Sequence, residues 1–183
     1  MEKIKIERPT IEDVEEMNQF FRLVVVDTFA QEGLAGLQDN IEAEIETKKK
    51  YLSMDLNSNG EDRYFLIAKR DEGIVGCIDY GTANELILSS TDGEFEDIVE
   101  VGTVFVHPEY RRQGIANKLL YAMYKILREK GKDEFCLDSG YTIAQQVWKK
   151  KFGDPDYLLK DYWSEGFHHM IWRVRLRDLV NGE

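Results

Sequence analysis

Only two cysteines, Cys77 and Cys136, occur in the 183 residues of this chain. Both stand among apolar neighbours in segments typical of strands, which favours two buried, reduced thiols over a disulfide. The sequence contains no Cys-x-x-Cys pair, and this excludes a site built on that spacing.

Long apolar runs are also missing. No segment approaches the roughly 18 apolar residues that a membrane span needs. Met1 to Arg8 alternates charged with apolar residues instead of showing the apolar core of a signal peptide. We therefore expect a cytoplasmic protein without a membrane partner.

Basic residues are outnumbered by acidic ones, 24 to 35, which gives a formal net charge of −11. Nucleic acids and anionic membranes attract basic surfaces, so neither is expected as a partner. The charge permits a cationic small-molecule substrate without requiring one.

A hydrophobic content of 43% suits one globular domain over residues 1–183. The oligomeric state is open, and a homodimer is compatible with the sequence.

Apolar periodicity predicts alternating strands and helices. The expected strands are Lys3–Glu7, Arg63–Lys69, Ile74–Gly81, Val101–Val106, Phe135–Asp138, Tyr157–Trp163 and Phe167–Leu176. The expected helices are Ile11–Gln31, Asp39–Met54, Ile115–Lys130 and Thr142–Phe152. Between them, Glu85–Asp97 is ambiguous, because Leu86–Leu88 could extend the preceding strand or form a bulged edge.

The run of strand, helix and strand from Val101 to Asp138 requires a right-handed parallel crossover, whereas the earlier strands should pair antiparallel. The prediction is therefore an α+β (mixed α/β) fold. Its central twisted sheet has about seven strands, is mostly antiparallel, contains one parallel βαβ crossover, and is flanked by about four helices.

A short loop with two arginines and one glycine joins the strand that ends at Val106 to the helix that begins at Ile115. The first turn of a helix has unpaired N–H groups, and a glycine lets a ligand oxygen approach the backbone. This combination predicts a phosphate-binding site. Neither the GxxxxGK[ST] pattern of a Walker A loop nor the GxGxxG pattern of a dinucleotide fold is present.

The loop resembles the acetyl-CoA-binding signature of the GNAT family of N-acetyltransferases, Gln/Arg-x-x-Gly-x-Gly/Ala. Arg111, Gly114 and Ala116 fill its three defined places. The order of elements is similar to that of the family over nearly the whole chain, and Ala144–Gly153 resembles the family's late helix. The resemblance implies a GNAT-like acyl-CoA transferase fold with acetyl-CoA as cosubstrate and no metal.

The same resemblance implies how acetyl-CoA is held. Backbone amides of the loop and first helical turn would bind the pyrophosphate, and the end of the preceding strand would pair with pantetheine as an added strand does. The implied cofactor-binding residues are Val104, Phe105, Val106, Arg111, Arg112, Gln113, Gly114, Ile115, Ala116 and Asn117.

Glu100 is the candidate general base, because in some family members a glutamate at this place takes a proton from the acceptor amine. The alternative is an exposed glutamate at the start of a strand. Glu100 should share a face with Gly102 and Val104 unless a bulge intervenes. The nearby acidic residues Glu94, Glu96 and Asp97 either attract an ammonium group or form a solvated turn.

The general acid departs from the family pattern. Trp148 stands where many members have a tyrosine, and an indole N–H is no useful acid. Tyr141 is the substitute candidate, against the alternatives of a tyrosine in the core or on the surface and of protonation by solvent. His168 and His169 are adjacent on a strand and point to opposite faces, which argues against joint metal binding.

These expectations predict an N-acetyltransferase that moves an acetyl group from acetyl-CoA to a primary amine by direct attack in a ternary complex. A backbone N–H near Val104 would stabilise the tetrahedral oxyanion. The alternatives are a non-catalytic module that binds acyl-CoA and a protein Nα- or lysine acetyltransferase. The acceptor amine cannot be read from the sequence.

Overall fold

The computed structural model describes residues 3–179 and contains a seven-stranded sheet with the strand order β1-β2-β3-β4-β5-β7-β6. Strand β4 pairs parallel with β5, and the pairs β1–β2, β5–β7 and β6–β7 are antiparallel. The strands are β1 (Lys5–Glu7), β2 (Arg63–Arg70), β3 (Gly73–Thr82), β4 (Val99–Val106), β5 (Glu134–Ser139), β6 (Tyr157–Ser164) and β7 (Phe167–Arg175). The predicted mixed sheet with a parallel crossover is confirmed.

Residues 3–179 contain five α-helices, one more than expected. They are α1 (Val14–Gln31), α2 (Gln38–Ser58), α3 (Glu85–Ser90), α4 (Ile115–Glu129) and α5 (Thr142–Phe152). The additional helix is α3, so both alternatives for Leu86–Leu88, a strand extension and a bulged edge, are wrong. Asn84 caps this helix, because its Oδ1 accepts a hydrogen bond of 3.0 Å from the Ile87 N–H.

Helix α2 continues one turn beyond its predicted end at Met54 and ends at Ser58. The next residue, Asn59, adopts the left-handed conformation with φ of 51° and donates its N–H to the Asp55 carbonyl. Asparagine tolerates this conformation better than most residues, which explains why the polar run ends the helix here.

The described chain divides into two compact units. One contains residues 3–80 and 103–126, and the other contains residues 81–102 and 127–179. The expectation of one domain over residues 1–183 stays a prediction.

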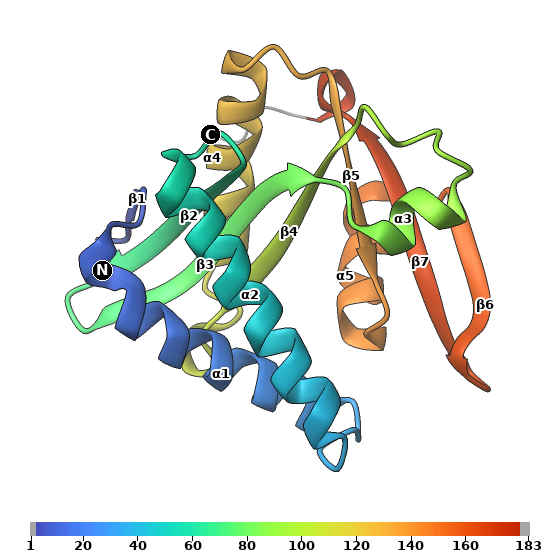
Figure 1. Cartoon of the computed structure of the whole chain (residues 1–183), viewed down its shortest axis with the longest axis horizontal. Helices are drawn as coiled ribbons and strands as arrows, with labels where there is room; N and C mark the ends of the chain where they lie inside the picture. The colour runs from blue at the N-terminus through green and yellow to red at the C-terminus, as the bar shows by residue number, and fades with distance from the viewer. Residues whose placement is uncertain (1–2, 180–183) are drawn as a thin grey trace. The chain divides into compact units, whose positions relative to one another are not determined.

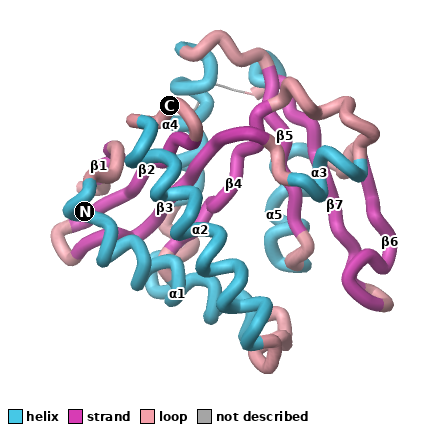
Figure 2. The backbone as a smooth tube through the Cα atoms, viewed as in Figure 1, coloured by secondary structure: helices cyan, strands magenta, loops and turns pink. Residues whose placement is uncertain are grey.

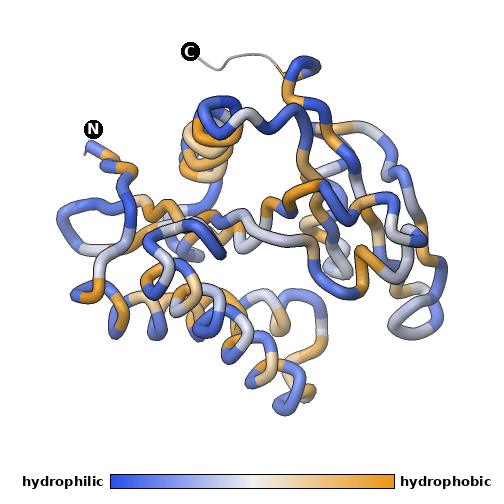
Figure 3. The backbone as a smooth tube through the Cα atoms, turned by 45° about the horizontal axis from the view of Figure 1, so that its top comes forward, coloured by the Kyte–Doolittle hydropathy of each residue, from blue (hydrophilic) through white to orange (hydrophobic). Residues whose placement is uncertain are grey.

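In the first unit, α1 and α2 cover one face of strands β2 and β3 (Figure 1). Figure 3 shows hydrophobic and hydrophilic residues alternating along these two long helices, as in amphipathic helices. The core that they bury consists of Met17, Phe20, Phe21, Val24, Leu52, Phe65, Ile67, Ile74 and Cys77. Helix α4 packs closely on β3, because a Cβ added at Gly76 would lie 2.9 Å from Ile115 and 3.0 Å from Leu119.

In the second unit, β7 lies between β5 and β6 (Figure 2). A core cluster forms from Ala83, Ile87, Phe95, Ile98, Cys136 and Ile171. Helix α5 packs on the sheet through an aromatic contact, since Phe152 meets the Phe135 ring edge-on at 6.0 Å. No helix within residues 3–179 is long and apolar enough to cross a membrane.

Both cysteines are free and buried, Cys77 in the first core and Cys136 in the second. Burial raises the pKa of each thiol well above its ordinary value. The neighbouring carboxylates, Asp79 for Cys77 and Glu100 for Cys136, raise these pKa values further. The interpretation of the cysteines as core thiols is therefore confirmed.

We expect Leu52→Ala to lower the free energy of unfolding by about 2–5 kcal/mol, because Leu52 is 2% exposed within the first core and its loss leaves a cavity. Leu23→Ala is the matched control on α1, where the leucine is 42% exposed, and it should cost roughly 1 kcal/mol or less. Urea unfolding monitored by circular dichroism measures both values. Equal destabilisation by the two variants would contradict the assignment of the core.

Candidate functional site

The loop between β4 and α4 has two left-handed residues, Arg112 with φ of 60° and Gly114 with φ of 81°. The Lys118 N–H donates to the Gly114 carbonyl at 3.1 Å, so Gly114 immediately precedes the first turn of α4. The helix itself offers no acceptor to the N–H groups of that turn, to which Ile115 and Ala116 belong. A Cβ added at Gly114 would meet nothing within 4 Å, so the space in front of this backbone is open.

Two side chains of the loop are held by residues of α1 and β2, which belong to the same unit as the loop. Arg111 forms an ion pair of 2.6 Å with Asp27 of α1, and Gln113 Oε1 accepts a hydrogen bond of 2.7 Å from Arg70. The Arg70 guanidinium also lies 4.7 Å from the centre of the Tyr110 ring. Arg112, in contrast, is exposed. The charge of Arg111 is thus partly balanced by a carboxylate, which the sequence did not indicate, while Arg112 presents its charge to solvent.

The end of β4 is anchored below this loop. Val104, Phe105 and Val106 are half-buried, and Phe105 packs against the first core with its ring 6.4 Å from Phe21. Just beyond the strand, the His107 N–H donates to the Val75 carbonyl of β3 at 2.9 Å.

Glu100 lies on β4 and is 6% exposed, so the alternative of an exposed glutamate is wrong. Its two carboxylate oxygens accept hydrogen bonds from the backbone N–H and the side-chain amide of Asn84, at 3.1 and 2.8 Å. The expected regular alternation with Gly102 and Val104 does not hold. Thr103, between them, has a left-handed φ of 50° and interrupts the extended backbone.

Glu100 belongs to a hydrogen-bonded network that we call the Glu100 network: Glu100, Asn84, Asp138, His169 and Trp163. The Asn84 amide also donates to Asp138 at 3.1 Å, and the same Asp138 oxygen lies 2.8 Å from His169 Nε2. The Trp163 indole N–H donates to His169 Nδ1 at 3.2 Å. An indole can only donate, so Nδ1 is an acceptor and the histidine proton resides on Nε2, from which it is donated to Asp138. The donors of Asn84 and His169 are therefore directed toward the carboxylates of Glu100 and Asp138, and Trp163 donates to the imidazole.

Gly140 makes room for this arrangement. A Cβ at that position would lie 2.5 Å from Trp163 Nε1 and 3.2 Å from His169 Nδ1. Any larger residue at position 140 would therefore separate the indole from the imidazole.

The sequence prediction missed Asn84, Asp138 and Trp163 and considered His169 only as a metal ligand. The one local signal was an aspartate in the otherwise apolar strand that contains Phe135.

The other predicted candidates are placed as follows. Tyr141 is half-buried, precedes α5, and its N–H donates to Ser139 Oγ at 3.1 Å. Trp148 is 9% exposed and stacks on Phe152 at 5.8 Å, so it is a core residue. His168 contacts Asp161, whose N–H it accepts at 2.9 Å, and thus has different partners from His169.

The acidic residues Glu94, Glu96 and Asp97 are exposed in a turn. Glu94 accepts a hydrogen bond of 2.7 Å from the Tyr157 hydroxyl, and this bond raises the pKa of Tyr157. The arrangement fits a solvated turn. Within residues 3–179, no three His, Cys, Asp or Glu side chains gather as a metal site would require.

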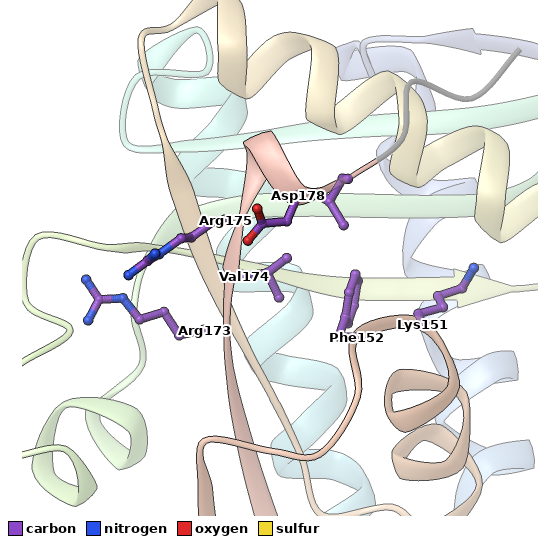
Figure 4. A pocket seen from close by; sticks show the side chains of 7 residues that line it. Lys151, Phe152, Arg173, Val174, Arg175 and Asp178 are labelled. Atoms are coloured by element: carbon purple, nitrogen blue, oxygen red, sulfur yellow. The ribbon is translucent and has the colours of Figure 1, made fainter.

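A pocket of about 170 Å³ lies elsewhere in the second unit, between the end of α5 and the end of β7 (Figure 4). Its lining consists of Lys151, Phe152, Arg173, Val174, Arg175, Asp178 and Leu179. The volume is below the roughly 300–1,000 Å³ of typical ligand pockets. None of the predicted site residues lines it.

Comparisons with known proteins bear on the loop and the fold together. A family model described as "Acetyltransferase (GNAT) family" matches residues 30–154, a range that includes β4, the loop and α4. No curated protein matches the chain.

Several solved structures share the fold. PaiA N-acetyltransferase from Thermoplasma acidophilum, solved in complex with coenzyme A, is 22% identical, with a TM-score of 0.64 and coverage of 94% of this chain and 99% of that one. YncA from Salmonella typhimurium, solved with acetyl-CoA, is 17% identical, with a TM-score of 0.62 and coverage of 99% and 98%. The ribosomal-protein-S18-alanine N-acetyltransferase from Escherichia coli is 12% identical, with a TM-score of 0.61 and coverage of 97% and 99%.

The Glu100 network predicts the tautomer of His169. We expect the imidazole to carry its proton on Nε2, because Nδ1 accepts from Trp163. Long-range ¹H–¹⁵N correlation spectra of the histidine rings measure this, and Trp163→Phe, which removes the donor, should shift the Nδ1 resonance of His169. A proton on Nδ1 in the unaltered protein would contradict the network.

Proposed function

Because the chain belongs to the GNAT family of acetyltransferases, we propose that it transfers the acetyl group of acetyl-CoA to a primary amine by direct attack in a ternary complex. One observation carries the proposal: within the residues that match the family, Gly114 opens α4 in a left-handed conformation with free space in front of its backbone. A phosphate oxygen can approach there where a side chain would block it.

The binding of acetyl-CoA is supported by the chemistry of the loop. The N-terminal end of α4 carries partial positive charge, the exposed Arg112 adds a full charge, and the first-turn amides are hydrogen-bond donors for the pyrophosphate. The proposal assigns the segment Val104–Val106, whose residues are half-buried, to pantetheine, which would pair with its backbone as an added strand does. Two structural neighbours were solved with coenzyme A or acetyl-CoA, which supports acetyl-CoA as the proposed cosubstrate.

The proposed chemistry begins with the transfer of a proton from the acceptor's ammonium group to Glu100, directly or through a water molecule, which leaves a neutral amine. The amine nitrogen then attacks the thioester carbon, and a backbone N–H near Val104 stabilises the oxyanion. When the intermediate collapses, the carbon–sulfur bond breaks and the nitrogen releases its second proton to solvent, which leaves the neutral amide. The CoA thiolate takes a proton from Tyr141, which solvent then reprotonates, or directly from solvent. The two hydrogen bonds from Asn84 hold the Glu100 carboxylate in place as a proton acceptor.

For the acceptor, we propose a small amine, and the net charge of −11 favours one that is cationic. A protein N-terminus or lysine is the alternative acceptor.

A second candidate function is a non-catalytic module that binds acyl-CoA. The observation in its favour is Trp148, which stands in the place of the usual tyrosine and is buried in the core. Binding of acetyl-CoA without turnover of any amine would support it.

We expect Gly114→Val to weaken coenzyme A binding at least tenfold, because the new side chain would occupy the open space in front of the loop. Gly131→Val is the matched control: Gly131 has a similar φ of 72°, equally open surroundings, and lies at the other end of α4. Both variants carry the same left-handed strain of roughly 1–2 kcal/mol. Calorimetric titration with coenzyme A measures the affinities, and equal effects of the two variants would argue against the phosphate site.

Glu100→Gln should lower kcat by about 10²–10⁴-fold, the usual contribution of a general base, and leave the affinity for coenzyme A within twofold. Release of the CoA thiol is followed with a panel of polyamines, aminoglycosides, amino acids and peptide N-termini. Glu129→Gln, on the exposed face of α4, is the control and should retain the original rate. An unchanged kcat in Glu100→Gln would remove Glu100 from the mechanism.

A further inference from the structure

Thr103 adopts a conformation that its residue type disfavours. It lies inside β4 with a left-handed φ of 50°, although the rest of a strand is extended. For a β-branched residue a positive φ is a true outlier, because the branched Cβ crowds the backbone. Glycine, which takes this conformation without strain, stands next to it at position 102. An outlier of this kind persists only when the surrounding structure holds it, and such outliers gather at functional sites.

Asp79 of β3 holds Thr103 in place. The Thr103 hydroxyl donates to Asp79 Oδ2 at 2.8 Å, and the other carboxylate oxygen accepts from Arg63 of β2 at 3.0 Å. The Arg63 guanidinium lies 3.7 Å from the centre of the Tyr51 ring. We refer to Arg63, Asp79 and Thr103 as the Asp79 clamp.

The Asp79 clamp is buried. Asp79 is 0% exposed, Arg63 4% and Thr103 5%. A buried carboxylate is costly unless it is both paired with a cation and hydrogen-bonded, and here Arg63 and Thr103 supply these two contacts. The hydroxyl of Thr103 therefore satisfies a buried charge, which gives the threonine a role at a position where glycine would be free of strain. Packing alone would not require a charged pair in this place.

The backbone geometry of Thr103 has a direct consequence for the next residue. The peptide plane that carries the Val104 N–H is rotated about the backbone bonds of Thr103, so the conformation of Thr103 sets the direction of that N–H. The burial pattern changes at the same point. Glu100, Val101 and Thr103 are buried, whereas Val104, Phe105 and Val106 are all half-buried. A left-handed residue within a strand interrupts the alternation of side chains and redirects the backbone.

We infer that the Asp79 clamp is a positioning device, which fixes Thr103 in its left-handed conformation and thereby aims the Val104 N–H at the thioester oxygen of acetyl-CoA. Asp79 and Arg63 are positioning residues, because they act on the reaction through Thr103. This inference rests on the proposed function. Positioning of the Val104 N–H explains both the strained backbone of Thr103 and the buried carboxylate of Asp79.

The test compares two substitutions of similar size. Thr103→Val keeps the shape and removes the hydroxyl, whereas Thr103→Ser keeps the hydroxyl. With the amine that the unaltered protein acetylates best, we expect kcat to fall at least tenfold in Thr103→Val and to stay within threefold in Thr103→Ser, since loss of one oxyanion donor costs about 10²–10³-fold. The affinity for coenzyme A should change less than twofold in both variants.

A merely structural role would not produce this split. An unchanged kcat in Thr103→Val, or an equal fall in both variants, would overturn the inference. If Thr103→Val does not fold, Thr103→Gly replaces it. Glycine tolerates the left-handed conformation but has no hydroxyl for Asp79 to hold and also populates other conformations, so the same tenfold loss is expected.

The Val104 amide provides a readout that does not depend on turnover. Addition of acetyl-CoA should shift its ¹H–¹⁵N resonance in the unaltered protein and in Thr103→Ser, and the shift should be much smaller in Thr103→Val. If the unaltered protein acetylates an amine and Thr103→Val shows the same rate and the same shift of the Val104 resonance, the role of the Asp79 clamp is contradicted while the proposed function stands. Failure of the unaltered protein to bind coenzyme A or acetylate any amine would contradict the proposed function, and the inference would fall with it.

Discussion

The parallel pairing of β4 with β5 is the constraint on which the site depends. Val99 is paired with Phe135 and Glu100 with Cys136, and two parallel strands cannot be joined by a tight turn. The chain must cross over, and α4 makes this crossover. The N-terminal end of α4 consequently follows the carboxyl end of β4, where a loop of left-handed residues opens the helix. One pairing requirement thus generates the strand end, the loop and the helix N-terminus that the proposed binding of acetyl-CoA uses.

The sequence predicted what is encoded locally. Amphipathic periodicity predicted the seven strands and four of the five helices, and the arginine and glycine spacing predicted the loop at Gly114. Helix α3 was missed because Leu86–Leu88 is apolar without a period, and such a run does not distinguish a short helix from a strand. Its cap at Asn84 was the only local signal, and Asn84 is equally common in turns.

Contacts between distant residues could not be predicted. In the Glu100 network, Asn84 is 54 residues from Asp138, and His169 is 31 residues beyond Asp138. The ion pair between Arg111 and Asp27 likewise joins separate parts of the chain. Each of these side chains is ordinary in its own segment, and only the tertiary fold gives it a partner. The strain of Thr103 is also invisible in the sequence, because a threonine in a β-branched run favours an extended strand.

The burial of both cysteines matters for the chemistry of an acetyltransferase, whose acyl donor is a thioester. Thioesters exchange their acyl group with thiolates, so an exposed cysteine could be acylated in place of the acceptor. Cys77 and Cys136, the only cysteines of the chain, are buried in separate cores, and the raised pKa of each thiol keeps it protonated. Neither thiol is therefore placed to take the acyl group from the activated donor of the family's reaction.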